Sequence, residues 1–117
     1  MCKPYRYNNL SYTVADDSDV YFTVEYLSDG NSGLTSVDVP GTLDPEIKNA
    51  GKVFIGKGKD LRGEATYVSS NIDNKVSQED EIRVKYLINN EELVEHHNLK
   101  SEAERITVIL KITFPRP

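Results

Sequence analysis

Hydrophobic and polar residues alternate along the C-terminal part of this chain. Between Arg105 and Phe114 the apolar side chains fall on one parity and the polar ones on the other, with Ile109 as the single exception. A period of two along such a segment predicts a β-strand with one face in a core and the other in water. The same alternation recurs in Glu81–Ile88 and Val20–Leu27, and three such strands favour an antiparallel β protein.

Other short segments carry a weaker form of this alternation: Tyr5–Ala15, Leu34–Val39, Lys52–Gly56, Gly63–Ser70 and Glu91–His97. Asn8-Asn9 interrupts the first of them and predicts a bulge or bend. Together with the three strands above, they give about eight strands at a spacing of roughly ten residues, which is typical of a β-sandwich.

Two groups of turn-forming residues predict hairpins. Ser28–Gly33 stands between two predicted strands, so we expect Val20–Leu27 and Leu34–Val39 to pair with each other. Asn89-Asn90 tolerates the positive φ of a two-residue turn and predicts that the strands on either side of it also pair.

The remaining connections are longer. Thr42–Gly51 suits a crossover between two sheets and offers one helical turn with Asp44 as its N-cap. Lys57–Arg62 and Asn71–Asp80 are polar and loop-like. The predicted fold is therefore all-β: a two-sheet antiparallel sandwich of about seven to eight strands, of immunoglobulin or transthyretin type. A small β-barrel is the alternative.

Length and charge narrow the class of protein. The 117 residues suffice for one domain; we expect residues 1–4 to form a flexible tether and residues 5–117 a single sandwich domain. With 38% hydrophobic and 28% charged residues, the composition is that of a globular protein. The net charge of −5 argues against nucleic acid as a partner, since nucleic-acid binding needs a basic surface.

Cys2 is the only cysteine, so no disulfide can form within the chain. A cysteine directly after the first methionine is where a mature bacterial lipoprotein begins, if Met1 stands in place of a removed signal peptide. Cys2 is then a candidate lipid anchor, and the protein is expected to be extracytoplasmic, in the cell envelope or secreted. The alternative is a chance surface cysteine on a flexible end.

Two charged segments are candidate ion sites. Gly56–Gly63 could cradle an anion with its backbone amides, helped by three basic side chains: Lys57, Lys59 and Arg62. Its spacing is not that of a phosphate-binding loop, and solvated lysines between glycines are the alternative. Three carboxylates in one turn, Asp16, Asp17 and Asp19, could hold calcium if Gln78–Glu81 lies nearby. A charged turn that keeps the sheet end soluble is the alternative.

The sequence offers no constellation typical of catalysis. His96 and His97 are the only histidines, and as strand neighbours they point to opposite faces, so they cannot readily share a metal ion. The simplest reading is two partly exposed strand histidines. No serine or cysteine stands in a recognisable nucleophile motif. We therefore expect no enzyme activity and no cofactor.

Tyrosine is unusually frequent, with seven residues against three phenylalanines. The N-terminal strands carry four of them: Tyr5, Tyr7, Tyr12 and Tyr21. An exposed cluster of these rings would be an interaction patch. The alternative is rim packing with the hydroxyls in water.

Between Tyr21 and Ile112 the order of features resembles the mycobacterial membrane protein small family and similar bacterial lipoproteins. The residues that carry the resemblance are Phe22–Tyr26, Val37–Pro40, Gly51–Ile55 and Ile82–Val84 with the Asn-Asn turn. It implies an immunoglobulin-like sandwich outside the cytoplasmic membrane that acts as an accessory or binding protein. Pro40-Gly41 replaces the Pro-Trp often found in that family, and no functional residue carries over.

These observations lead to one predicted function with two alternatives. We expect a non-catalytic envelope accessory or protein-interaction module, lipid-anchored through Cys2. Its partner is then a protein or a cell-envelope component. The alternatives are a carrier of a small apolar ligand, which needs an internal cavity, and a structural module of a longer surface protein.

Overall fold

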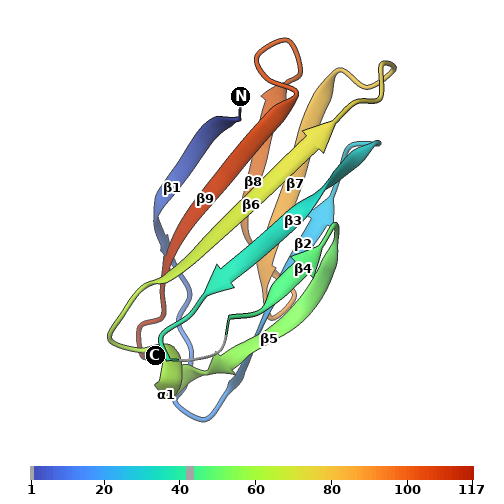
Figure 1. Cartoon of the computed structure of the whole chain (residues 1–117). Coiled ribbons are helices and arrows are strands. Elements are labelled where there is room, and N and C mark those ends of the chain that lie inside the picture. The colour runs from blue at the N-terminus through green and yellow to red at the C-terminus, as the bar shows by residue number, and fades with distance from the viewer. Residues whose placement is uncertain (1, 42–43) are drawn as a thin grey trace.

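The computed structural model describes residues 2–41 and 44–117, in which nine strands and one short helix build two stacked sheets (Figure 1). The strands are β1 (Lys3–Ser11), β2 (Asp19–Tyr26), β3 (Asn31–Asp38), β4 (Glu46–Lys48), β5 (Gly51–Lys57), β6 (Thr66–Asn74), β7 (Glu81–Ile88), β8 (Glu91–Leu99) and β9 (Arg105–Thr113), and the helix is α1 (Gly58–Leu61). The predicted all-β sandwich is confirmed.

The first sheet has the strand order β1-β9-β6-β3-β4, and the second has the order β5-β2-β7-β8. Both sheets are open at their edges, so the part of the chain that the structure describes does not form the alternative barrel. All pairs are antiparallel except β1–β9, which is parallel. The first strand, β1, thus lies beside the last strand, β9, and it forms one edge of the first sheet.

The core lies between the sheets and is built by the alternating strands. In β9 the side chains of Ile106, Val108, Leu110 and Ile112 are fully buried, and those of Ile82, Val84, Tyr86 and Ile88 are fully buried in β7. The Tyr86 ring stacks on Phe22 of β2, with ring centroids 5.9 Å apart. Burial of these faces on one another is the main favourable contribution to folding.

Two local predictions are confirmed by the backbone. The pairing of β1 with β9 shifts between Tyr7 and Leu10, which places the predicted irregularity at Asn8-Asn9. Asn89 and Asn90 have φ values of 50° and 67°, as a tight turn between β7 and β8 requires.

The predicted hairpin of residues 20–39 is wrong. β2 and β3 lie in different sheets, and the segment between them is a corner rather than a hairpin turn. Ser28 is buried there, and its hydroxyl oxygen accepts hydrogen bonds from the Arg83 backbone N–H at 2.9 Å and from the Asn31 amide at 2.9 Å. Turn-forming residues predict a reversal of direction, but the partner of each strand is set by the packing of the two sheets.

The connections also differ from the prediction. The helical turn predicted after Asp44 is absent from the described residues; Glu46–Lys48 forms β4 instead, because Ile47 is buried and β4 pairs with β3. Residues 42–43 lie outside the described residues. The crossover between sheets is confirmed, since β4 and the following β5 belong to different sheets. The predicted loop Lys57–Arg62 contains α1, which buries Leu61.

Two strands have bounds that differ from the predicted ones, again because of burial and pairing. β6 continues to Asn74 because Ile72 and Asn74 are buried, and the Asn74 amide donates to the Asp29 carbonyl at 2.7 Å. At the N-terminus, Lys3 and Pro4 belong to β1, where they pair with β9, so they are not part of a tether. β1 ends at Ser11 rather than at the predicted Ala15.

Candidate functional site

The two charged candidate sites lie against each other at the α1 end of the sandwich. The Lys57 ammonium is 3.0 Å from an Asp19 carboxylate oxygen, and the Arg62 guanidinium is 2.8 Å from that of Asp16. Two backbone bonds join the same segments, from the Gly58 N–H to the Ser18 carbonyl and from the Lys59 N–H to that of Asp16. Two of the three predicted anion-binding cations, Lys57 and Arg62, are thus counter-ions of two of the predicted calcium-binding carboxylates, while Asp17 contributes its backbone carbonyl, 3.4 Å from the Lys57 ammonium.

Arg62 is a structural residue in this arrangement. Its side chain is 17% exposed and donates to the carbonyl oxygens of Val14 and Phe114, at 2.7 Å each. Its hydrogen bond also holds the pKa of the Asp16 carboxyl below its usual value. With these donors occupied, the anion-binding hypothesis gains no support from the geometry.

The calcium hypothesis gains no support either. The second acidic segment, Gln78–Glu81, lies at the opposite end of the sandwich from Asp16, Asp17 and Asp19 (Figure 1). Among the described residues, no three side chains of the kinds His, Cys, Asp or Glu come together as a metal site would require. Calcium binding therefore stays a prediction from the sequence.

The four tyrosines do not form one patch. Tyr21 lies on the outer face of the second sheet, where its ring meets Phe54 edge-on with centroids 5.5 Å apart. Tyr12 lies beyond the end of β1, beside Glu91. Tyr5 and Tyr7 lie on β1 and pack against His96 of the facing sheet, with ring centroids 4.5 Å and 5.9 Å apart.

The Tyr21–Phe54 pair, which we call the aromatic patch, is accessible. Tyr21 is 36% exposed and Phe54 39% exposed, and the Lys52 ammonium lies 5.1 Å from the centre of the Tyr21 ring. A surface hollow of about 560 Å³ opens beside Phe54, lined by Val39, Pro40, Gly41, Phe54, Ile55, Gly56, Lys57 and Asp60. The sequence pointed to Tyr21 but missed Phe54, because only the pairing of β2 with β5 brings the two rings together.

His96 is a titratable residue in the interior of the protein. Its side chain is fully buried between the edge strands β8 and β1, so the expectation that it is partly exposed is wrong. Its Nδ1 atom is 2.7 Å from the Tyr7 hydroxyl, and its Nε2 atom is 2.8 Å from Oδ1 of Asn98. Both ring nitrogens therefore have partners inside the protein.

The directions of the two hydrogen bonds that join Tyr7, His96 and Asn98 follow from the contacts of Asn98. The Asn98 amide nitrogen donates to the carbonyl oxygens of Leu99 at 3.0 Å and Ala103 at 3.1 Å. Its Oδ1 atom must then accept, so Nε2 of His96 carries the hydrogen. In the neutral ring Nδ1 is bare and accepts the hydrogen bond from the Tyr7 hydroxyl.

Burial sets the ionisation of both residues. It lowers the pKa of His96, with a smaller opposing effect from the hydrogen bond with Asn98. It also raises the pKa of the Tyr7 hydroxyl. A raised pKa makes Tyr7 a poor nucleophile, and the surface hollows of about 530 to 560 Å³ are lined by other residues. The arrangement is suited to holding β1 in place.

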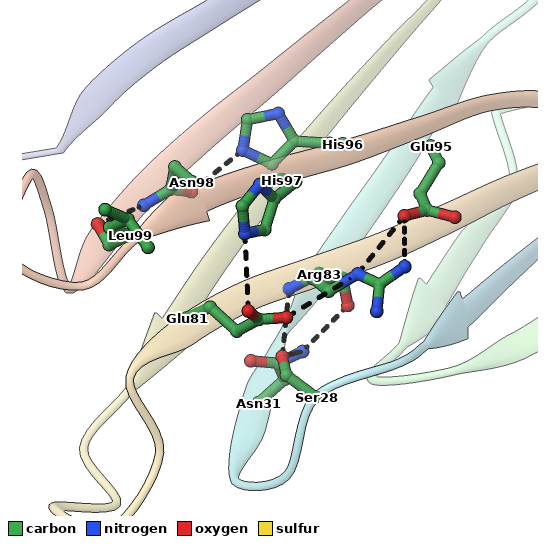
Figure 2. A network of polar contacts seen from close by, with 9 residues as sticks. All are labelled: Ser28, Asn31, Glu81, Arg83, Glu95, His96, His97, Asn98 and Leu99. Atoms are coloured by element: carbon green, nitrogen blue, oxygen red, sulfur yellow. Dashed lines mark hydrogen bonds and ion pairs between the residues drawn. The ribbon is translucent and has the colours of Figure 1, made fainter.

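His97 points to the opposite face from His96, as predicted, and joins a surface network (Figure 2). Its Nε2 atom lies 3.4 Å from a Glu81 carboxylate oxygen. The Arg83 guanidinium lies 3.6 Å from the Glu81 carboxylate and 2.6 Å from that of Glu95, so Arg83 pairs with an acidic residue on β7 and with another on β8. These contacts are solvent-exposed and each contributes little to stability.

No protein-family model, no curated protein and no solved structure matches this chain. Among the residues that the structure describes, no helix has the length and apolar character needed to cross a membrane. Evidence on function therefore comes from the geometry alone.

Proposed function

We propose that this protein is a non-catalytic interaction module, held at its N-terminal end and binding a protein partner through the aromatic patch. The observation that carries the proposal is the exposed Tyr21–Phe54 pair on the outer face of the second sheet, beside a hollow that Phe54 also lines. Exposed aromatic residues next to a concave surface are typical of binding interfaces. The surrounding charges of Lys52, Lys57 and Asp60 supply a polar rim.

The position of the patch agrees with a tether at Cys2. The described molecule measures 45 × 24 × 21 Å, and the N-terminus lies at the end of the long axis opposite to α1 (Figure 1). Tyr21 and Phe54 pair in the half of the sandwich that leads to α1. A lipid on the exposed Cys2 would therefore leave the patch facing away from the membrane.

We further propose that the protein is an immunoglobulin- or transthyretin-like lipoprotein of a bacterial cell envelope. In this proposal it lies outside the cytoplasm, and its partner is a protein or another envelope component. The packed core supports an interaction module over a carrier, since twenty hydrophobic side chains are buried between and beside the sheets. The second alternative is a structural module of a longer surface protein, which would also use exposed faces.

Site-specific photo-crosslinking in cells that express the protein tests the proposal. A photoreactive phenylalanine analogue is placed at position 21 or position 54, and, as the matched control, at position 67. Tyr67 is also exposed, at 46%, but it lies on the outer face of the first sheet. We expect a defined crosslinked protein band from positions 21 and 54 and none from position 67.

A second variant keeps the test decisive. Phe54→Ala is expected to remove the crosslink from position 21 while leaving the melting temperature within a few degrees, because Phe54 is exposed. Equal crosslinking from both faces, or none from either, would contradict an interface at the aromatic patch.

A further inference from the structure

β1 is attached to the sandwich in an unusual way. It pairs with β9 along one side only, and its first half, Lys3–Tyr7, matches Ile106–Leu110 before the bulge interrupts the register. On the side of the second sheet, β1 is held by side-chain contacts. The most buried of these contacts is the hydrogen bond between Tyr7 and His96. The first half of β1 is therefore held by one edge pairing, by the packing of Tyr5 and Tyr7 around His96, and by exposed contacts with Glu102.

The hydrogen bond that the Tyr7 hydroxyl donates to His96 requires a neutral imidazole ring. Because Nε2–H already donates to Asn98, a proton taken up from acidic solution must bind at Nδ1. Nδ1 then becomes a donor, and the Tyr7 hydroxyl can no longer donate to it. The phenol must turn to present its oxygen, and its hydrogen loses its acceptor inside the protein.

The charged ring would also be poorly placed. Its cross-strand partner on β7 is Val84, which is fully buried and apolar. The titratable and charged groups around His96 are Lys3, Tyr5 and Tyr7 on β1, His97 on its own strand, Glu102 on the β8–β9 connection, and Tyr86 on β7 near Tyr7.

Their effects on the charge of His96 oppose one another. Glu102 favours a charged ring, but its carboxylate also lies 3.9 Å from the Lys3 ammonium and 3.4 Å from the Tyr5 hydroxyl. His97 disfavours the charge. Burial is the largest effect and also disfavours it.

We propose that His96 is a proton-operated latch that holds the first half of β1 on the sandwich at neutral pH and releases it on acidification. Release uncovers the backbone edge of β9 at Ile106–Leu110, which β1 otherwise pairs with. Acid therefore converts a paired edge of the first sheet into an unpaired one, independently of the aromatic patch.

Hydrogen exchange at single amides, measured from about pH 7.5 to about pH 4.5, tests the latch. This range brackets the ordinary pKa of histidine. After correction for the intrinsic exchange rate, we expect the protection of the paired amides of Lys3, Tyr5, Arg6 and Tyr7 to fall by up to tenfold for each pH unit between the ordinary pKa of histidine, which His96 regains when β1 is released, and the lower pKa of His96 in the closed fold. Protection in β6 and β7 is expected to stay high over the same range.

The neighbouring histidine provides a matched control. His97→Gln is expected to keep the pH dependence of β1 protection, because His97 lies on the outer face, with its midpoint moved slightly upward since His97 disfavours a charge on His96. His96→Gln keeps a donor and an acceptor but cannot be charged, so the pH dependence of β1 protection is expected to vanish. Protection of β1 that is independent of pH in the wild type, or that falls equally in His96→Gln, would overturn the proposal.

A measurement on the wild type covers the case in which His96→Gln does not fold. The imidazole proton of His96 is assigned by comparison with His97→Gln and titrated by NMR. A titration midpoint at the pH where the loss of β1 protection levels off supports the latch. A midpoint elsewhere, or a simultaneous loss of protection in β1 and the core strands, would overturn it.

Discussion

Replacing Arg62 tests whether this residue is structural, as its contacts indicate. In Arg62→Met the apolar stem is kept and the guanidinium is lost. The wild-type side chain is 17% exposed and donates to two backbone carbonyls at 2.7 Å. Hydrogen bonds from charged groups contribute about 1.5 to 3 kcal/mol each, and the lower value suits this partly wet position. The ion pair with Asp16 adds little, because Asp16 is half-exposed and is also 3.4 Å from Arg116.

The expected loss in the free energy of unfolding is therefore roughly 3 kcal/mol, or about 10 °C in melting temperature for a domain of this size. Urea unfolding followed by circular dichroism measures it. Lys59→Met is the matched control, because Lys59 is an exposed cation of the same segment, and we expect its effect to stay below about 0.5 kcal/mol. If Arg62→Met were as stable as Lys59→Met, the structural role of Arg62 would be refuted.

Two further predictions concern stability. Burial raises the pKa of Tyr26 to about 12 from 10.0, so the unfolded chain loses this proton first and stability is expected to fall between pH 10 and pH 12. Urea unfolding at several alkaline pH values should show a smaller fall in Tyr26→Phe, and an equal fall would contradict the assignment. In the tight turn, Asn89→Gly and Asn90→Gly both suit a positive φ, but only the first removes the hydrogen bonds of the Asn89 side chain with the Tyr21 N–H and the Asp19 carbonyl. We expect Asn89→Gly to be less stable than Asn90→Gly by about 1 to 2 kcal/mol in thermal unfolding, and equal stability would show that these bonds contribute nothing.

The sequence predicts the strands of this fold better than their partners. β7 and β9 match the predicted bounds to within one residue, because apolar and polar positions alternate along both with a single exception in each, Leu87 and Ile109. The Asn89-Asn90 turn is predicted for the same reason, since few residues tolerate its φ values. The hairpin of residues 20–39 fails because alternation tells which face of a strand is buried, not which sheet the strand joins.

The buried position of His96 is hidden from the sequence by a single irregularity. Counting from the Asn89-Asn90 turn, Ile88 faces Glu91 and Leu87 faces Glu92, which would place Glu95 opposite the buried Val84. The register shifts between Tyr86 and Leu87, and His96 takes that place instead. One extra residue in β8 reverses the direction of every side chain after it.

The candidate ion sites fail for a different reason. Each charged segment reads as a possible ligand site when it is considered alone. The fold brings the two segments together: Arg62 pairs with Asp16 across a sequence separation of 46, and Lys57 pairs with Asp19 across a separation of 38. The acceptors of Arg62 on Val14 and Phe114 are backbone carbonyls, which no side-chain pattern can reveal.

The most direct test of a tethered interaction module is the mass of the N-terminal peptide of the native protein, taken separately from the membrane and soluble fractions of its own cells. The account predicts a membrane-fraction peptide that begins at Cys2 and carries a mass increase the size of a diacylglyceryl group. An unmodified peptide that keeps Met1 and is found in the soluble fraction would contradict the tether, and with it the orientation that leaves Tyr21 and Phe54 facing away from a membrane.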